Sequence, residues 1–316
     1  MMYVTIASLR HSTFKMNFAN VRTPRQSITE YLVSELDIRV AYVRRKLESA
    51  ALFARENYPH SSCLYFTLPE FFWNVPWREI DSEEELHELT TAYLEKVPVY
   101  VRSLMADLPV EQFGKIVLLA GSCATLIKVG EGEDSYYDVI NYLLTMTNKE
   151  YETDTPLMSM WPKRYVSGID FGEHFASENG YWIFKLFDEV LVKVKKLSSV
   201  QSEHSYFGGY GQMFVNSLVP GCPFSINLCL DYVAQRDGER DNEFELVDAK
   251  IDFLIACGMT FEGDKHHPLS IQFSVRNDGM GRGQCEIVKL EKGLIVDDIP
   301  LEVIDDNVYL ACIPIE

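Results

Sequence analysis

The chain has 316 residues, of which 47% are hydrophobic, 12% aromatic and 24% charged. This composition excludes a disordered, collagenous or coiled-coil protein and is typical of a globular protein with a large core. A membrane span needs roughly 18 to 20 consecutive apolar residues, whereas the best apolar runs, such as Ile116 to Ala120, have only the length of a strand. We therefore expect a soluble protein with no membrane partner.

The net charge and the first residues of the chain indicate which partners and which cellular compartment to expect. The 29 Lys and Arg residues stand against 47 Asp and Glu, which gives a formal net charge of −18. Because such a surface repels phosphate groups, we expect no nucleic-acid partner. The short basic runs, Arg44 to Lys46 and Lys193 to Lys196, are expected on solvated faces. Met1 to Ser8 lacks the long apolar segment and cleavage site of a secretory signal, so we expect a cytoplasmic protein.

The first third of the chain alternates short apolar strands with long amphipathic helices, which is typical of α/β layers. Tyr3 to Ser8 predicts the first strand. Ser27 and Glu30 form a capping-box pattern, and apolar residues at helical spacing predict that the following helix ends near residues 57–59. Leu64 to Thr67 predicts the next strand.

A second capping-box pattern, at Ser82 and Glu85, predicts another helix, which Pro98 should kink or restart. The remainder of the chain is dominated by predicted strands. These are Ile116 to Ala120, Val139 to Thr147, Phe224 to Leu230, Ile251 to Ala256, Ile271 to Val275, Cys285 to Leu290 and Val308 to Ile313. Between Tyr151 and Ser202, turn formers and short runs such as Tyr181 to Phe187 do not distinguish helix from strand. Since no repeat, linker or change of composition divides the chain, we expect a single domain over residues 1–316.

The sequence gives no sign of a metal or cofactor site. The seven cysteines lack CxxC spacing and are odd in number, which argues against a zinc ribbon or a disulfide framework. The adjacent His266 and His267 have no spaced acidic partners, so an exposed loop is the simpler interpretation than a metal site. The glycine-rich stretch at residues 206–211 lacks the spacing of a phosphate-binding loop and is interpreted as a flexible rim. We expect no cofactor and no metal.

Three chemically capable side chains follow predicted strands, where open α/β sheets place their chemistry. Glu70 stands among apolar neighbours in Leu68 to Trp73, where burial would raise its pKa towards that of a general base or acid. Lys163 follows Pro162 in an aromatic setting and suits an oxyanion donor. Cys229 ends a buried strand, where a nearby ammonium and a helix N-terminus would favour its thiolate form.

In this order and context, the three residues resemble the nitrilase, or carbon–nitrogen hydrolase, superfamily. The matching pieces are the opening strand, Leu68 to Glu70, Leu118 to Ser122, Asn141, Lys163, Cys229 to Asp231, Arg276 to Gly279 and the closing strand. The resemblance implies a four-layer αββα sandwich that commonly forms a homodimer across a helical face.

The same resemblance implies a role for each residue of the Glu-Lys-Cys triad. Cys229 would be the nucleophile that forms a thioester, Glu70 the general base and acid, and Lys163 the oxyanion stabiliser, with help from the backbone N–H of Leu230. Many members add a second glutamate between the lysine and the cysteine, for which Glu173 is the candidate, with Glu178 and Glu189 behind it. No cofactor enters this chemistry.

The residues after Cys229 bear on the substrate. Nitrile hydrolysers of the family typically show Cys-Trp-Glu, whereas Cys229-Leu230-Asp231 is closer to the Cys-Tyr-Asp of amidases and carbamoylases. We therefore expect hydrolysis of a small linear amide or carbamoyl compound. An enzyme that transfers the acyl group to an amine remains an alternative. So does a thiol protease that pairs Cys229 with His174 or His266, although it would leave Glu70 and Lys163 unexplained.

Two departures from the family pattern favour a further alternative, a degenerate member that uses the fold for binding or assembly. The segment before Leu64 is longer than usual, which predicts either an extended first helix or an extra element that covers the site. The segment from Cys257 to Pro268 is too short and polar for a full crossover helix. The aromatic residues near the expected mouth, Phe71, Phe72, Trp73, Trp161, Tyr165 and Tyr206, would either line a pocket or pack its rim.

Overall fold

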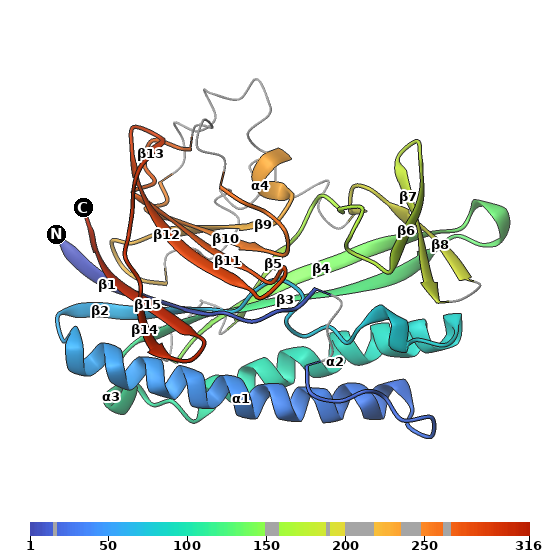
Figure 1. Cartoon of the computed structure of the whole chain (residues 1–316), viewed down its shortest axis with the longest axis horizontal. Helices are drawn as coiled ribbons and strands as arrows, with labels where there is room; N and C mark the ends of the chain where they lie inside the picture. Colours follow the sequence, from blue (N-terminus) through green and yellow to red (C-terminus); the bar gives the residue numbers. More distant parts are fainter. Residues whose placement is uncertain (15–17, 149–157, 188–189, 200–217, 235–247, 262–266) are drawn as a thin grey trace.

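The computed structural model describes residues 1–14, 18–148, 158–187, 190–199, 218–234, 248–261 and 267–316. Within these residues, two long helices cover one face of a large mixed sheet, and a smaller sheet covers the other face (Figure 1). The predicted α/β class is confirmed. The predicted glycine-rich rim, Tyr206, Glu189 and His266 lie outside the described residues.

The helical layer consists mainly of α1 (Ile28–Asn57) and α2 (Glu83–Ala106), followed by the short α3 (Val110–Phe113). The capping box of Ser27 and Glu30 forms as predicted, with both reciprocal bonds present. At α2 only half of the expected box forms, because the Glu85 carboxylate accepts bonds from Arg22 Nη1 (2.7 Å) and Asp81 N (2.8 Å) instead.

The predicted restart at Pro98 is wrong, since α2 runs through this residue as one element. Val97 and Val101, on either side of it, are fully buried against the sheet layer. Packing of this apolar face outweighs the backbone bond that proline removes. No helix among the described residues is long and apolar enough to cross a membrane.

The large sheet has ten described strands, with β5 paired to β4 beside the main order β14-β15-β1-β2-β3-β4-β8-β7-β6. Strands β1, β2 and β3 are parallel to one another at its centre. The bounds are β1 (Met2–Leu9), β2 (Ser61–Thr67), β3 (Ile116–Val129), β4 (Tyr136–Thr147), β5 (Met158–Pro162), β6 (Glu173–Glu178), β7 (Tyr181–Phe187), β8 (Val190–Lys195), β14 (Glu302–Asp305) and β15 (Val308–Ile315). Strands β6, β7 and β8 extend the sheet at the end far from the two chain termini (Figure 1).

The smaller sheet has the order β13-β12-β11-β10-β9, in which β9, β10 and β11 are parallel. Its strands are β9 (Phe224–Leu228), β10 (Ile251–Ala256), β11 (Phe273–Asp278), β12 (Gln284–Glu291) and β13 (Leu294–Asp298). The described residues between β10 and β11 contain no helix. Among the described residues, α4 (Asp231–Ala234), with four residues, is the only helix on the outer face of this sheet. The implied fourth layer is therefore represented there by α4 alone.

Two apolar cores hold the layers together. One fills the space between the helices and the large sheet, and the other lies between the two sheets. Both faces of the central strands are therefore buried, which explains why these strands appear in the sequence as nearly continuous apolar runs.

A buried asparagine joins the two sheets close to the strand exits. Asn277 Nδ2 donates to Leu9 O (3.2 Å), Thr67 O (3.1 Å) and Thr67 Oγ1 (3.0 Å). Leu9 and Thr67 are the last residues of β1 and β2, and Asn277 lies near the end of β11. The carboxyl ends of the central strands of both sheets thus meet at one place, where Glu70 and Cys229 leave their strands.

Candidate active site

Glu70 leaves β2 in a tightly fixed turn. The next residue, Phe71, has a φ of 59°, a left-handed conformation that is unusual for a side chain of its size. Ser122 Oγ accepts a bond from Phe71 N (3.0 Å), and Thr13 Oγ1 donates to Glu70 O (2.6 Å). Gly121, with a φ of 67°, lets the turn approach β3, since a Cβ there would lie 2.5 Å from Pro69 O. These contacts fix where the Glu70 carboxyl points.

Lys163 follows β5, and hydrogen bonds from its own backbone and from the two following residues hold the segment in place. Its N–H donates to Asn141 O of β4 (2.7 Å). The next two backbone N–H groups, of Arg164 and Tyr165, donate to the carboxylate of Asp231 at 2.9 to 3.0 Å. Because Asp231 lies two residues beyond Cys229, it ties the lysine segment directly to the cysteine segment.

Cys229 stands at the sharp turn between β9 and α4. It has a φ of 48°, and its N–H donates to Ile255 O of the neighbouring strand (3.0 Å). Tyr232 N donates to Cys229 O (3.0 Å), and Cys229 Sγ contacts Cys257 O at 3.8 Å. The strained backbone turns the thiol out of the strand's alternation, a feature that persists only where the surrounding structure holds it.

The three side chains predicted from the sequence come together. Lys163 Nζ donates to Glu70 Oε1 (2.9 Å) and to Asp170 Oδ2 (2.8 Å). Asn141 Nδ2 also donates to Glu70 Oε1 (3.1 Å). The Cys229 thiol lies close enough to act on the pKa of Glu70, although no bond of ordinary hydrogen-bond geometry joins the two side chains. Glu70 Oε2 therefore remains without a hydrogen-bond partner.

Burial and charge set the protonation of this cluster. Burial raises the pKa of Glu70 to about 7, against the lowering effect of Lys163, while Asp170 pushes it further up. Burial alone would lower the pKa of Lys163, but the charges of Asp170 and Glu70 outweigh it and raise that pKa well above its usual value. Near neutral pH the lysine is therefore an ammonium and the glutamate titrates.

The protonation state of the Cys229 thiol differs from the one that the sequence led us to expect. Burial, followed by the charge of Glu70, raises the pKa of Cys229 well above its usual value, and Lys163 only partly opposes them. The ammonium favours the thiolate as predicted, but it does not prevail over burial and the carboxylates. Cys229 is thus a neutral thiol at rest, and its activation requires a base that accepts its proton.

Glu173 does not contact Lys163. It lies exposed at the start of β6, with Glu178 at the other end of that strand. The carboxylate that holds Lys163 is Asp170, which is 4% exposed and also accepts the N–H of Ser167 (3.0 Å). Leu230, half-buried, stands between Cys229 and Asp231, so its backbone N–H belongs to the turn that carries the thiol.

Sequence reasoning missed Asp170 and the structural part played by Asp231. Asp170 follows Lys163 by seven residues, through a turn closed by Asp170 N to Ser167 O (3.2 Å). A loop of this kind has no periodicity, so only its nearness to Lys163 and its apolar neighbour Phe171 could have singled it out. Asp231 was visible in the motif after Cys229, but its partners come from a segment 66 and 67 residues away.

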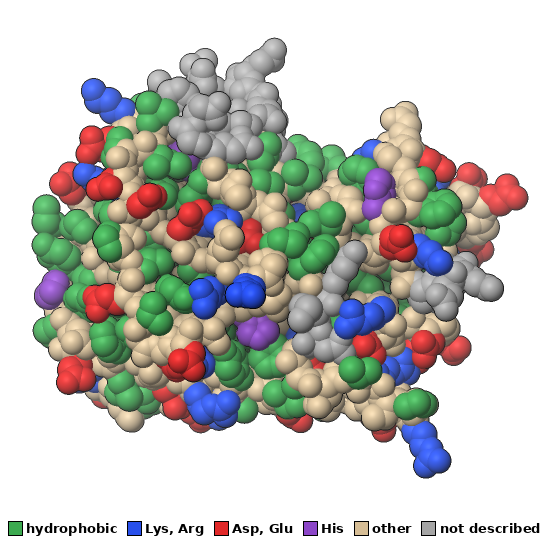
Figure 2. Space-filling model, in the orientation of Figure 1, with side chains coloured by type: hydrophobic (Ala, Val, Ile, Leu, Met, Phe, Trp, Pro, Cys, Tyr) green, Lys and Arg blue, Asp and Glu red, His purple; other side chains and the backbone are tan. Residues whose placement is uncertain are grey.

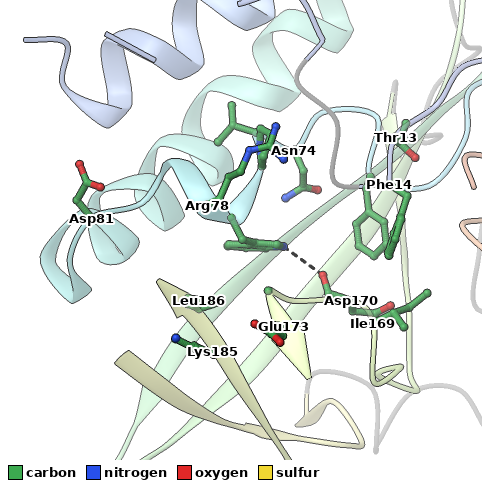
Figure 3. Close-up of a pocket in the computed structure, with 15 residues that line it drawn as sticks. Thr13, Phe14, Asn74, Arg78, Asp81, Ile169, Asp170, Glu173, Lys185 and Leu186 are labelled. Carbon is green, nitrogen blue, oxygen red and sulfur yellow. Dashed lines mark hydrogen bonds between the residues drawn. The ribbon is translucent and has the colours of Figure 1, made fainter. Parts of the chain in front are cut away.

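A cavity of about 390 Å³ adjoins the cluster (Figure 3). Phe71 and Asp170 form its inner end, and Phe14, Trp77, Ile169 and Leu186 give it apolar walls. Trp77 Nε1 donates to Asp170 O (3.1 Å), which fixes the indole beside the carboxylate. Arg78, Asp81, Glu173 and Lys185 complete the charged part of the lining.

The expected aromatic mouth is only partly present. Phe71 lines the cavity, whereas Phe72, Trp73 and Trp161 are buried in the cores. Trp77 and Phe14, which were not singled out, line the cavity instead.

On the face seen in Figure 2, Lys and Arg side chains are interspersed with Asp and Glu.

The histidine alternatives do not assemble a site in the described residues. His174 is exposed on β6, where its Nε2 lies 3.1 Å from Ala176 O. His267 is buried, and its Nε2 lies 3.4 Å from Tyr232 Oη. Within the ranges that the structure describes, no group of three His, Cys, Asp or Glu residues could hold a metal ion.

Comparison with known proteins gives similarity at the level of structure. No family model matches the chain, and no curated protein matches it. A carbon-nitrogen hydrolase from Helicobacter pylori G27 aligns with 98% of this chain and 88% of its own, at 10% identity and a TM-score of 0.45. A glutamine-dependent NAD(+) synthetase from Cytophaga hutchinsonii aligns with 99% of this chain and 43% of its own, at 12% identity and a TM-score of 0.38.

Proposed function

We propose that the protein is a thiol-dependent amidohydrolase that cleaves a carbon–nitrogen bond of a small amide or carbamoyl compound through a thioester on Cys229. The observation that carries the proposal is the buried cluster itself. One ammonium, Lys163, bridges two carboxylates beside a thiol held at a strained turn. Such a cluster supplies a nucleophile, a base and an oxyanion donor within one site.

Acylation begins with attack of Cys229 Sγ on the carbonyl carbon of the substrate. The S–C bond forms as the C=O π pair moves to oxygen, and the thiol proton passes to Glu70. Oε2 suits this transfer because it has no hydrogen-bond partner, whereas Oε1 is held by Lys163 and Asn141. A pKa of about 7 allows Glu70 to take up and release a proton near neutral pH.

The developing oxyanion needs donors that are already in place. Two N–H groups of Lys163 Nζ are directed to Glu70 and Asp170, which leaves a third for the substrate oxygen. The backbone N–H of Leu230 is the second donor of this proposal. Collapse of the intermediate breaks the C–N bond, and Glu70 gives its proton to the departing nitrogen, so that ammonia or an amine leaves.

Deacylation reverses these roles with water as the nucleophile. Glu70 takes a proton from water as the oxygen attacks the thioester carbon. Collapse then breaks the C–S bond, and the proton returns to Cys229, which releases a carboxylic acid. An amine in the place of water would make the protein a transferase by the same steps.

The test is release of ammonia from a panel of primary amides, terminal ureido compounds and nitriles. We expect turnover of amides or ureido compounds by the wild type, and loss of it in Cys229→Ala, Glu70→Gln and Lys163→Ala. Cys312→Ala, which removes a partly buried thiol on β15 opposite Thr5, is the matched control and should retain activity. Turnover restricted to nitriles would refute amide hydrolysis, and no turnover of any member by a folded protein would favour the binding-module alternative.

A further inference from the structure

The interior of the cluster contains buried hydrogen-bond acceptors that no donor reaches. Three buried acceptor atoms have no partner there: Glu70 Oε2, Asp170 Oδ1 and Asn141 Oδ1. The other polar atom of each of these side chains is already bonded within the same cluster. Buried polar atoms are rarely left unpaired, because each forfeits its hydration. The empty cluster is therefore complementary to a group that brings N–H donors.

A primary amide brings two N–H donors on the nitrogen that departs. A carboxylate or other anion close to the scissile bond would add further acceptors and would be repelled by Glu70 and Asp170. Because the nitrogen of a primary amide bears no substituent, the rest of such a substrate lies on the acyl side. That part of the molecule needs a space next to the cluster.

The cavity beside Asp170 provides this space. Its volume of about 390 Å³ lies in the range of small-molecule pockets. Its apolar walls include the aromatic rings of Phe14, Phe71 and Trp77. Trp77 is held both by its bond to Asp170 O and by packing on Phe171, with ring centroids 5.0 Å apart. A rigid apolar wall suits a flat or branched hydrocarbon group rather than a charged chain.

The charges in the lining do not select an ion of either sign. Glu173 and Lys185 lie directly opposite one another on β6 and β7, and they carry opposite charges. Arg78 and Asp81 supply a second cation and a second anion, and the remaining carboxylate, Asp170, is paired with Lys163. With these charges balanced, the apolar side chains determine what the cavity takes.

Resting on the proposed function, we infer that the substrates are primary amides whose acyl group ends in an aromatic or branched aliphatic group, which occupies the cavity between Phe71, Trp77 and Ile169. The smallest linear amides would leave this cavity empty. The acyl group thus supplies the apolar contact, while the NH₂ group satisfies the acceptors around Lys163.

Aldehydes test this inference without turnover. An aldehyde reacts reversibly with an active-site thiol: the S–C bond forms, the C=O π bond breaks and the thiol proton ends on the oxygen. Phenylacetaldehyde and acetaldehyde differ only in the group that would enter the cavity. The readout is protection of Cys229 against iodoacetamide, measured by peptide mass spectrometry as a function of aldehyde concentration.

The matched variants are Ile169→Trp, which fills the cavity from a residue that is 38% exposed, and Val296→Trp, at a half-exposed site on β13 away from it. In the wild type and in Val296→Trp, we expect phenylacetaldehyde to protect at concentrations at least about tenfold lower than acetaldehyde. In Ile169→Trp this preference should disappear, while the small reagent iodoacetamide still labels Cys229 at the wild-type rate.

Equal protection by the two aldehydes in a wild type whose Cys229 labels readily would overturn the substrate class and leave the proposed function standing. A preference that survives in Ile169→Trp would overturn the assignment to this cavity. If Cys229 is neither labelled nor protected in the folded protein, both the proposed function and this inference fail.

Discussion

Substitution of Gly121 by alanine tests how closely β3 packs against the turn that carries Glu70. The φ of 67° makes any side chain unfavourable there, and the added Cβ would lie 2.5 Å from Pro69 O and 3.0 Å from the Cβ atoms of Leu68 and Phe72. Gly132 offers a matched control, because it has a φ of 66° and nothing within 4 Å of an added Cβ. Both substitutions therefore place a side chain at nearly the same positive φ, and they differ in the contact.

The magnitudes follow from these geometries. An alanine at positive φ costs about 1 to 2 kcal/mol, and the entropy it removes from the unfolded chain offsets roughly 0.4 to 1 kcal/mol. For Gly132→Ala we expect a net loss of about 1 kcal/mol in the free energy of unfolding. For Gly121→Ala the overpacking adds roughly 1 to 3 kcal/mol, because backbone must move.

Urea unfolding followed by circular dichroism measures the difference between the two variants. We also expect Gly121→Ala to slow the labelling of Cys229, since the displaced turn carries Glu70, whereas Gly132→Ala should label as the wild type does. Equal loss of stability in the two variants would refute the close approach of β3 to the Glu70 turn.

Three further predictions concern the charges of the cluster. Labelling of Cys229 should rise with pH through about 7, because Glu70 accepts the thiol proton only when ionised, and this rise should vanish in Glu70→Gln while the protein stays folded. In Asp170→Asn the same rise should move to lower pH, because the charge that raises the pKa of Glu70 is gone; an unchanged midpoint would contradict this. Asp231→Ala should lose roughly 2 to 5 kcal/mol in urea unfolding, since two buried backbone N–H groups lose their acceptor, and a loss below about 1 kcal/mol would mean that the tie to the lysine segment is weak.

Local signals predicted much of the architecture. The capping residues Ser27 and Glu30 marked the start of α1, and the strand from Ile251 to Ala256 was predicted at its observed bounds. Short apolar runs marked the cores of longer strands, as for β3, whose predicted part ends at Ala120 but which continues to Val129. The continuation is buried only as far as Leu126 and is not uniformly apolar, so composition alone understated its length.

What escaped prediction depends on contacts between distant segments. Pro98 was expected to interrupt a helix, but packing of the apolar residues around it keeps α2 continuous. Glu85 was expected to cap α2, but Arg22, 63 residues earlier, takes its carboxylate. Both outcomes follow from tertiary contacts that override local preference.

The candidate site likewise combines residues that the local sequence predicts with features that depend on contacts between distant segments. Glu70, Lys163 and Cys229 were each predictable from a strand exit and its neighbours, and the structure places them together. Asp170 was not, because it lies in an irregular loop and a carboxylate there becomes meaningful only when Lys163 is seen to reach it. The protonation of Cys229 also required the structure, since the balance between burial and the opposing charges depends on the packing around it.

The most direct test of the thiol chemistry is the rate at which each cysteine reacts with iodoacetamide near neutral pH, followed by intact-mass and peptide mass spectrometry. Cys229 is 3% exposed, whereas Cys285 and Cys312 are more accessible. We expect Cys229 nevertheless to react first, the fast adduct to be absent in Cys229→Ala, and the rate to fall in Lys163→Ala and Glu70→Gln. If Cys229 reacts no faster than Cys285 and Cys312 in the folded protein, the cluster does not activate its thiol and the proposed amide hydrolysis is wrong.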